Sequence, residues 1–325
     1  MWRTSLTENA ILSFMITNFL LSIVIPVYNE ENNIDPLLIR LLPVIKNYNY
    51  EIIFINDGSK DKTDEVIKTK AKTNTKIKLV SFLRNFGHQK ALTCGYSFAK
   101  GDCVISMDAD LQDPPEIISQ MVEKWKKGAK VIYAKREKRD VDNFLKKLTA
   151  HLFYKFINFL SDTPIPSDVG DYRLLDREVV NFLNKLPEKS RFLRGLVAWG
   201  GYPADYVYFK REKRFAGITH YTFSKMLNFA LDGIASFSVK PLRLSIYFGF
   251  FASFFSIFVI VTKSVQHFIL NQGDWLPGWA SLFFSIVFLG GVQLITMGII
   301  GEYVGKIYQE LQDRPQYLIK EKVNL

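Results

Sequence analysis

Two long stretches without a charged residue divide this chain of 325 residues into a mainly polar part and an apolar part. One stretch runs from Leu244 to Thr262 and the other from Trp275 to Gly301. Each is long enough to cross the hydrocarbon core of a bilayer, which takes ~18 to 20 apolar residues, and buried core helices of this length and uniformity are rare. The sequence therefore predicts two transmembrane helices, over 241–265 and 275–301.

The formal net charge of +10 gathers beside these apolar runs, and the loop that joins them carries little net charge. By the positive-inside rule, basic flanks of this kind place both chain ends in the cytoplasm. Basic juxtamembrane segments also attract anionic lipid headgroups, so the charge favours a lipid surface over nucleic acid. We therefore expect a multi-pass protein of the plasma (inner) membrane with both termini cytoplasmic. The flanking cations are Lys240, Arg243, Lys306, Arg314, Lys320 and Lys322.

Short β-branched runs alternate with helical patterns through the polar part of the chain. Strands are expected at Leu21–Pro26, Glu51–Asn56, Ile77–Phe82, Cys103–Met107 and Val131–Ala134. Strands and helices that alternate at this spacing form βαβ units around a mostly parallel sheet. The expected fold class is α/β, with one Rossmann-like domain before the membrane helices.

The fourth strand runs into an acidic segment, residues 108–113, in which Asp108, Asp110 and Gln112 alternate with other residues. Carboxylate and amide oxygens are hard ligands suited to Mg²⁺ or Mn²⁺, which keep some waters and share substrate phosphates. A solvated acidic turn that caps the helix opened by Pro114 would have the same composition, and this short pattern alone leaves both interpretations open.

Polar residues also follow the first three strands, at Glu30, Asp57 and Asn85. Each one alone is ordinary turn chemistry. Their recurrence predicts a binding crevice, because the carboxyl ends of parallel strands meet at one edge of the sheet. The segment after the first strand contains no G-x-G-x-x-G and the chain has no P-loop sequence, which disfavours a dinucleotide dehydrogenase and a P-loop nucleotidase.

Cysteine and histidine give no sign of a metal or redox centre. Cys94 and Cys103 fit no zinc or redox spacing and are expected to be buried thiols. The four histidines are scattered, without H-x-x-H or H-E-x-x-H, so a histidine metal site is not expected.

Basic amphipathic patterns over 143–160 and 223–237 predict helices that lie in the membrane interface, although a soluble surface helix would also explain the first. The predicted organisation is an N-terminal extension (1–20), a cytoplasmic domain (21–220), a juxtamembrane amphipathic helix (221–240), transmembrane helices (241–265 and 275–301) and a cytoplasmic C-terminal tail (302–325).

Six motifs follow one another in the chain. They are Ile-Pro-Val-Tyr-Asn-Glu (25–30), Asn-Asp-Gly-Ser (56–59), Arg-Asn-Phe-Gly (84–87), Asp-Ala-Asp-Leu-Gln-Asp-Pro-Pro-Glu (108–116), Asp-Val-Gly-Asp-Tyr-Arg-Leu-Leu-Asp-Arg (168–177) and Arg-Phe-Ala-Gly (214–217). With these motifs and two C-terminal apolar runs, the chain resembles family-2 glycosyltransferases of the GT-A fold. More closely, it resembles polyisoprenyl-phosphate glycosyltransferases of the bactoprenol glucosyltransferase type, which are related to dolichol-phosphate mannose synthase.

The resemblance implies an inverting, metal-dependent transfer of one sugar, with glucose from UDP-glucose favoured, to polyprenyl (undecaprenyl) phosphate at the cytoplasmic face. It implies that Asp110, Gln112 and Asp108 hold Mg²⁺ or Mn²⁺, and that Asp171 joins these three in the catalytic set. The nucleotide sugar would contact Pro26, Tyr28, Glu30, Asp57, Ser59, Asn85, Lys90 and Asp108. The acceptor phosphate would be seated by Arg136 and Lys147, with Asp168 nearby.

The same residues are compatible with other functions. A processive polysaccharide synthase shares the donor site but typically adds Gln-x-x-Arg-Trp, and Arg194 and Trp199 have the wrong spacing for that motif. A membrane-anchored nucleotide-binding scaffold without turnover would keep the same site. GDP-mannose and an aminopentose donor remain alternatives to UDP-glucose. Glycines at 290, 291, 298 and 301 allow close helix packing, which leaves a homo-oligomer open.

Overall fold

The computed structural model describes residues 19–137, 169–210, 238–268 and 279–325. The chain forms two compact units. Of the described residues, the first unit contains 19–137, 169–210 and 314–325, and the second contains 238–268 and 279–313. The predicted N-terminal extension, the amphipathic segment 143–160 and the segment 223–237 lie almost wholly outside the described residues.

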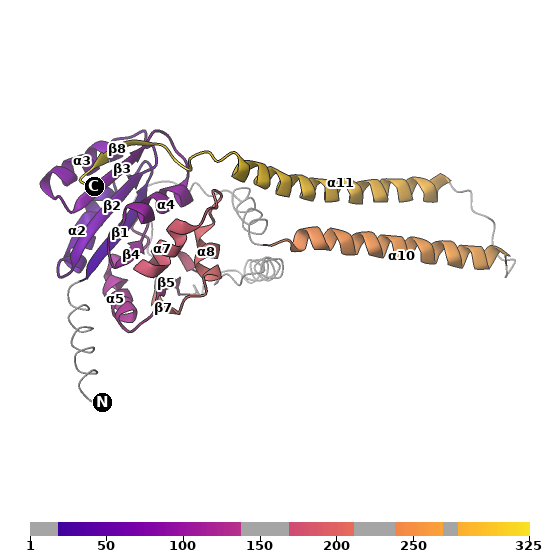
Figure 1. Ribbon diagram of the computed structural model, residues 1–325, viewed down its shortest axis with the longest axis horizontal. Coiled ribbons are helices and arrows are strands. Elements are labelled where there is room, and N and C mark those ends of the chain that lie inside the picture. Colours follow the sequence, from indigo (N-terminus) through magenta and orange to yellow (C-terminus); the bar gives the residue numbers. More distant parts are fainter. Residues whose placement is uncertain (1–18, 138–168, 211–237, 269–278) are drawn as a thin grey trace, which may run out of the picture. The chain divides into compact units, whose positions relative to one another are not determined.

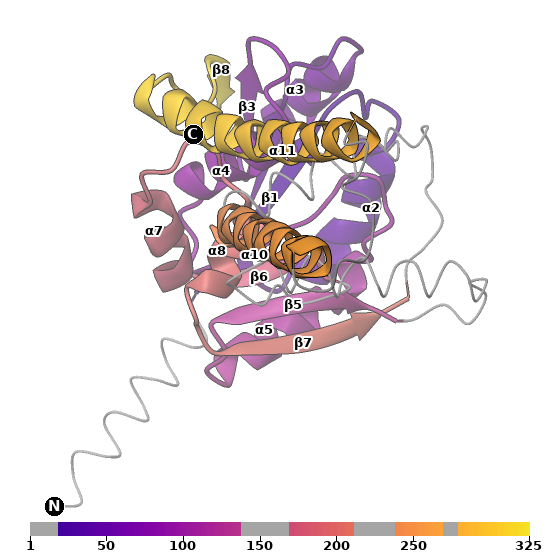
Figure 2. The same ribbon diagram turned by 90° about the vertical axis from the view of Figure 1, so that its right-hand side faces the viewer.

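The first unit is built on one mixed sheet, which has eight strands within the described ranges. Their order is β7-β5-β6-β4-β1-β2-β3-β8, so that β7 and β8 lie at opposite edges (Figure 1, Figure 2). The strands are β1 (Leu20–Val27), β2 (Asn49–Asn56), β3 (Ile77–Phe82), β4 (Cys103–Ser106), β5 (Val131–Arg136), β6 (Val169–Asp176), β7 (Ala204–Phe209) and β8 (Ile319–Val323).

Parallel pairing dominates the sheet. Strand β1 pairs in parallel with β2 and with β4, β2 pairs in parallel with β3, and β5 pairs in parallel with β7. Only β6 and β8 run against their neighbours. The predicted α/β class with a mostly parallel sheet is confirmed, and the five predicted strands all form.

Helices cover both faces of this sheet (Figure 1). Helices α2, α3 and α5 pack together on one side, whereas α4 packs with α7, which also contacts α8, on the other. The side chains of β1 alternate between these layers: Ile23 and Ile25 join the core cluster that includes α2, and Val24 lies against Gly95 of α4. The helices are α2 (Ile34–Ile45), α3 (Thr63–Thr73), α4 (His88–Phe98), η1 (Pro115–Ile117), α5 (Ile118–Lys126), α7 (Arg177–Lys185) and α8 (Leu193–Trp199).

The second unit contains two long helices, α10 (Lys240–Phe268) and α11 (Trp279–Leu311). Most of the exposed large apolar side chains of the described residues lie on these two helices. By length and composition, one segment, Ser285–Leu311, is apolar and long enough to cross a membrane. Two transmembrane helices are therefore not confirmed: α10 forms where the first span was predicted, but its crossing of a membrane stays a prediction.

The C-terminal segment differs from the tail predicted over 302–325. Helix α11 does not end with the charge-free run at Gly301. Glu302, Tyr303 and the residues after them stay helical as far as Leu311. Residues 319–323 then form β8, which adds to the edge of the sheet beside β3 (Figure 2). No strand was expected in this segment.

Candidate active site

The carboxyl ends of β1, β2, β3 and β4 meet at one edge of the sheet, because these four strands are parallel neighbours. Glu30, Asp57, Asn85 and Asp108 follow these four strands in turn. The polar strand ends that the sequence singled out therefore share one rim, as expected for a sheet of this class.

The acidic segment after β4 is a tight turn rather than a helix start. Leu111 has a φ of 59°, a left-handed conformation that few non-glycine residues adopt. Asp110 is buried, and its Oδ1 accepts a hydrogen bond from the backbone N–H of Gln112 at 3.1 Å. The hydroxyl of Tyr172 on β6 donates to the carbonyl oxygen of Pro114 at 2.9 Å, which fixes the far side of the turn. Asp110 and Gln112 are thus held in one turn, next to the more exposed Asp108.

Asp57 joins the loop after β2 to the loop after β3. Its carboxylate accepts hydrogen bonds from the backbone N–H groups of Phe86, at 2.6 Å, and Gly87, at 2.9 Å. Burial raises the pKa of Asp57 although these two hydrogen bonds oppose the shift. Gly58, with a φ of 70°, lies directly against the backbone of Arg84, where a Cβ atom would collide with it. The two loops therefore form one packed unit.

The loop after β1 is fastened to the same unit. The backbone N–H of Asn29 donates to Ser59 Oγ at 3.0 Å, and Asn29 Oδ1 accepts from the backbone N–H of Lys60 at 2.8 Å. The backbone N–H of Glu30 donates to Thr63 Oγ1 at 2.9 Å. Tyr28 and Ser59, both predicted to contact a nucleotide, are thereby brought into neighbouring, hydrogen-bonded loops.

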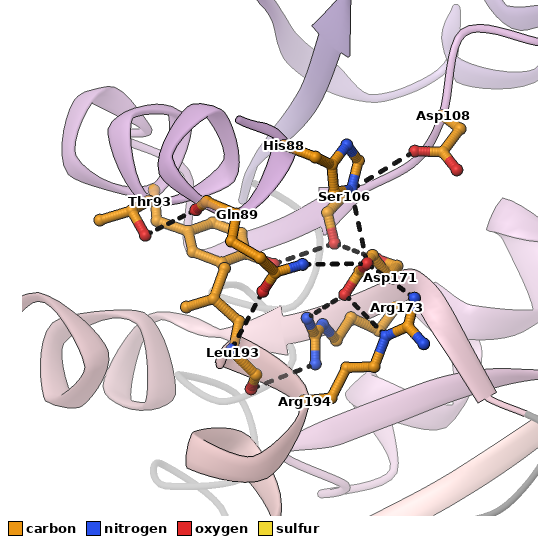
Figure 3. Close-up of polar contacts among 10 residues, drawn as sticks. His88, Gln89, Thr93, Ser106, Asp108, Asp171, Arg173, Leu193 and Arg194 are labelled. Atoms are coloured by element: carbon orange, nitrogen blue, oxygen red, sulfur yellow. Dashed lines mark hydrogen bonds and ion pairs between the residues drawn. The ribbon is translucent and has the colours of Figure 1, made fainter. Parts of the chain in front are cut away.

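An ionic cluster around the buried carboxylate of Asp171 lies beside this rim (Figure 3). Asp171, on β6, accepts hydrogen bonds from Arg173 Nη2 at 2.9 Å and from Arg194 Nη2 at 2.9 Å. Gln89 Nε2 donates to it at 3.3 Å, and His88 Nε2 lies 3.4 Å from its carboxylate. Four partners from three separate segments therefore converge on one carboxylate.

The cluster strongly shifts the protonation of its members. Burial alone would raise the pKa of Asp171, but Arg194, His88 and Arg173 hold it well below its ordinary range. Desolvation disfavours the charged imidazole of His88, yet Asp108 and Asp171 together raise its pKa to about 9. Two guanidinium groups and one imidazole thus face the carboxylate of Asp171, which favours its ionised form.

The same cluster connects Asp171 to the acidic turn. His88 Nε2 lies 3.7 Å from Asp108 Oδ1, so one imidazole faces two carboxylates (Figure 3). Burial raises the pKa of Asp108, His88 opposes this shift, and the nearby carboxylates of Asp110 and Asp171 add to it. The carboxylates of Asp108 and Asp110 therefore lie close enough to influence one another, and Asp171 is occupied by its own cationic partners.

Sequence reasoning missed His88, Gln89, Arg173 and Arg194 as members of this site. The spacing of the histidines fits no metal motif, so the sequence gives no reason to expect one in the site. Arg173 stands within the quoted motif 168–177, and His88 directly follows the motif 84–87, so position beside a motif was the signal available. Gln89 and Arg194 gave no such signal.

The remaining predicted residues are more dispersed. Pro26 is buried within β1, and Lys90 is half-buried in the first turn of α4. Arg136 ends β5, and its Nε is buried without a hydrogen-bond partner in the described part of the chain. A Cβ atom on Gly170 would lie 3.5 Å from Arg136 Nη2. Lys147 and Asp168 lie outside the described residues.

Within the described ranges, no group of three or more His, Cys, Asp or Glu side chains is arranged to hold a metal ion by itself. The predicted metal ligands do not form such a group, because only two of the three are carboxylates and the third is an amide. They still fit Mg²⁺ or Mn²⁺, because these ions typically take one or two carboxylates and complete their shell with waters and substrate phosphates.

Comparison with known proteins gives one family. The model of glycosyl transferase family 2 matches residues 22–183. An uncharacterized glycosyltransferase of Synechocystis sp. is 47% identical over 306 residues, which cover 93% of this chain and 95% of that protein. The bactoprenol glucosyl transferase of Shigella phage SfII is 44% identical over 303 residues, which cover 93% of this chain and 97% of that protein.

The chain also resembles a solved structure at lower sequence identity. The chain is similar to glucosyl-3-phosphoglycerate synthase from Mycobacterium tuberculosis, solved in complex with Mn²⁺, uridine-diphosphate-glucose and phosphoglyceric acid. The match covers 69% of this chain and 80% of that chain, at 17% sequence identity and a TM-score of 0.45.

Proposed function

Because the chain belongs to glycosyltransferase family 2, we propose that it transfers a single glucose from UDP-glucose to a polyprenyl phosphate, such as undecaprenyl phosphate. The observation that carries this proposal is the match to bactoprenol glucosyl transferases, which covers 93% of this chain. That share extends beyond the family-2 region, 22–183, into the segments that form α10 and α11.

The donor would lie along the rim where the four parallel strands end. Asp57 and Ser59, with Tyr28 and Glu30, would hold the base and ribose, because these residues belong to loops that are bonded to one another. Asn85 and Lys90 would close the donor site, and Pro26 would shape its floor at the end of β1. Asp108 would reach the ribose or the metal ion.

Asp110 and Gln112, with Asp108, are the residues that would hold Mg²⁺ or Mn²⁺. When bound, such an ion supplies Lewis-acid stabilisation of the negative charge that builds on the leaving diphosphate, worth several kcal/mol. The tight turn that joins Asp110 to the backbone of Gln112 supports this assignment, because it fixes both residues before any ligand arrives.

The reaction needs no general base, since the acceptor is already a phosphate anion. An acceptor phosphate oxygen forms a bond to the anomeric carbon while the bond from that carbon to the UDP oxygen breaks, and its electron pair leaves with UDP. A single displacement from an α-linked donor gives a β-linked lipid product, so the transfer would invert configuration. Positioning and electrostatics would then account for most of the rate.

Cations would seat the acceptor phosphate. Arg136 is the first candidate, because its Nε is a buried donor without a partner in the described residues and guanidinium groups match phosphate oxygens in pairs. Lys147 is the second candidate and Asp168 would orient it. Asp171, with its four cationic or amide partners, would keep Arg194 and His88 in place beside the reacting groups.

The site would work at the cytoplasmic face of the plasma membrane. The apolar segment Ser285–Leu311 and the exposed apolar surface of α10 support attachment to a bilayer, where a polyprenyl chain is dissolved. The basic residues that flank both helices support the cytoplasmic side.

The test is a transfer assay on the full-length protein in membranes or detergent. The protein is incubated with Mg²⁺ or Mn²⁺, undecaprenyl phosphate and a panel of radiolabelled nucleotide sugars, and the label in the organic phase is counted. We expect label from UDP-glucose, its loss on chelation of the metal, and its loss in Asp110→Ala.

Asp205→Ala is the matched control, because Asp205 is a carboxylate of β7 that pairs with Lys124 and is half exposed. This variant should transfer at the wild-type rate. If no donor gave lipid-linked label, the proposed reaction would be wrong, and a fully active Asp110→Ala variant would remove the metal assignment.

A further inference from the structure

The C-terminal segment, residues 314–325, belongs to the same compact unit as the sheet. Strand β8 pairs antiparallel with β3, with Leu79 opposite Val323 and Ser81 opposite Glu321. The register shifts between Ser81 and Phe82, at the end of β3 that leads into the loop 83–87. Residues 312–318 connect β8 to the end of α11. The segment is therefore continuous with the apolar helix at one end and with the catalytic sheet at the other.

Specific side chains fasten the middle and the C-terminal end of β8. Glu321 Oε2 lies 2.6 Å from Lys68 Nζ on α3. Asn324 Nδ2 donates to the carbonyl oxygens of Ala71, at 2.8 Å, and Ile77, at 2.9 Å. Asn324 is thereby held at the start of β3, whereas Glu321, opposite Ser81, ties the middle of β8 to α3.

Aromatic packing fastens the other end. The ring of Tyr317 stacks on that of Phe82, with centroids 4.9 Å apart and planes at 10°. Phe82 meets Phe86 edge to face at 5.8 Å. The backbone N–H of Leu83 donates to the carbonyl oxygen of Leu318 at 3.0 Å. Because the N–H of Phe86 donates in turn to Asp57, Tyr317 reaches the donor rim through two ring contacts and one hydrogen bond.

Besides these contacts, the loop between Phe82 and α4 is held in the described part of the chain by the carboxylate of Asp57 and by the close approach of Gly58 to Arg84. Leu83, Arg84 and Asn85 are exposed, and the guanidinium of Arg84 covers the ring of Phe86 at 4.3 Å. An exposed loop of this kind samples other conformations unless packing restricts it. The C-terminal segment restricts Phe82 directly, through the stack with Tyr317, and Phe86 through the ring of Phe82.

From these contacts we infer that Tyr317 is a positioning residue for the nucleotide site. It holds the aromatic pair Phe82 and Phe86 so that the N–H groups of Phe86 and Gly87 stay aimed at Asp57. The residue does not touch the donor itself. The inference rests on the proposed donor site for its effect on catalysis, whereas its effect on the loop is independent of any substrate.

The experiment compares four full-length proteins: wild type, Tyr317→Ala, Tyr317→Phe and Glu321→Gln. Hydrogen–deuterium exchange reports the backbone amides of Phe86 and Gly87, and titration with UDP and Mn²⁺ reports donor affinity. Because one aromatic pair is typically worth a factor of about 2 to 10 in an equilibrium constant, Tyr317→Ala should speed exchange and weaken UDP binding by about that factor.

The other variants isolate the ring. Tyr317→Phe keeps the stack and should match the wild type in both measurements. Glu321→Gln breaks the pair between the middle of β8 and Lys68 of α3 without changing an aromatic ring, and it should leave the amides of Phe86 and Gly87 unchanged. In transfer assays, Tyr317→Ala should raise the KM for UDP-glucose while kcat and the KM for the lipid acceptor stay constant. Tyr317→Leu, which keeps apolar contact with Phe82, replaces Tyr317→Ala if the alanine variant does not fold.

Two results would overturn the inference. One is an unchanged exchange rate of the Phe86 and Gly87 amides in Tyr317→Ala, and the other is an equal increase in Glu321→Gln, which would mean that the strand acts only through general stability. A wild-type protein that binds UDP but transfers no sugar to lipid would contradict the proposed function. Faster exchange in Tyr317→Ala alone would still support the positioning role of Tyr317.

Discussion

Replacement of Asp171 by asparagine should destabilise the catalytic unit far more than an ordinary loss of an ion pair. The side chain of Arg173 is 0% exposed and that of Asp171 is 6% exposed, and their nearest nitrogen and oxygen lie 2.9 Å apart. At an effective dielectric constant of about 20, two unit charges at this separation attract by about 6 kcal/mol. Asparagine keeps the shape but removes the negative charge, which leaves Arg173 buried with an uncompensated charge.

The net loss of stability is smaller than this attraction. The protein relaxes around the unpaired arginine, and the intact pair already carries the cost of removing two charges from water. Loss of one partner from a buried ion pair typically destabilises a protein by about 3–5 kcal/mol. With a urea m-value of about 2 kcal/mol per molar, the unfolding midpoint of Asp171→Asn should fall by about 1.5–2.5 M. The midpoint is measured by the fluorescence change of the solubilised full-length protein in urea.

Asp205→Asn is the matched control for this measurement. Asp205 and Lys124 form a pair of similar length, 2.7 Å, but their side chains are 45% and 34% exposed. Exposed pairs contribute about 0–1 kcal/mol, so the midpoint of this variant should hardly move. Equal shifts in the two variants would refute the reasoning, because burial of Arg173 would then make no difference.

Two further predictions concern stability. Burial alone would raise the pKa of Glu51, but the hydrogen bonds from Lys78, Ser22 and the backbone of Lys100 hold it below its ordinary value of 4.5. A depressed pKa in the folded state contributes stability above the unfolded pKa that is lost as the pH falls through the folded pKa. Glu51→Gln should therefore flatten the acid limb of a plot of urea midpoint against pH, and an unchanged acid limb would contradict the assignment. Gly58→Ala should destabilise the protein by about 1–3 kcal/mol more than Gly128→Ala. Both glycines have a positive φ, but only Gly58 lies against neighbouring backbone. Equal unfolding midpoints for the two variants would show that no collision occurs.

Much of the sheet could be predicted from the sequence because its central strands are buried on both faces. The four strands that line the rim read as short apolar runs, and each ends within two residues of its predicted limit. Parallel order then placed Glu30, Asp57, Asn85 and Asp108 at a shared edge, which the structure confirms. These features depend on hydrophobic patterning and on chain direction, and both are local properties of the sequence.

Strands β6 and β8 could not be found in the same way. Strand β6 contains Asp171 and Arg173, which look like loop residues until their pairing in the interior is known. Strand β8 has the sequence Ile-Lys-Glu-Lys-Val and is mostly exposed at the edge of the sheet, so it carries no apolar pattern. Both strands form because of partners that lie far away in the sequence.

Only the part of the site that is contiguous in the sequence could be predicted. The acidic turn 108–113 is contiguous, so its composition reveals it. The cluster around Asp171 joins α4, β6 and α8, and only the fold brings His88, Gln89 and Arg194 within reach of one carboxylate. A histidine without a neighbouring metal motif gave no hint that it would face both Asp108 and Asp171.

The central claim of this account is that the turn after β4 binds a divalent ion that joins the donor diphosphate to the protein. The most direct test is a structure of the full-length protein with UDP-glucose and Mn²⁺, with the manganese located by its anomalous scattering. The account predicts one manganese peak bonded to Asp110 and Gln112 or Asp108, with the uracil near Asp57. A nucleotide bound away from this rim, or manganese bound only by other residues, would contradict it.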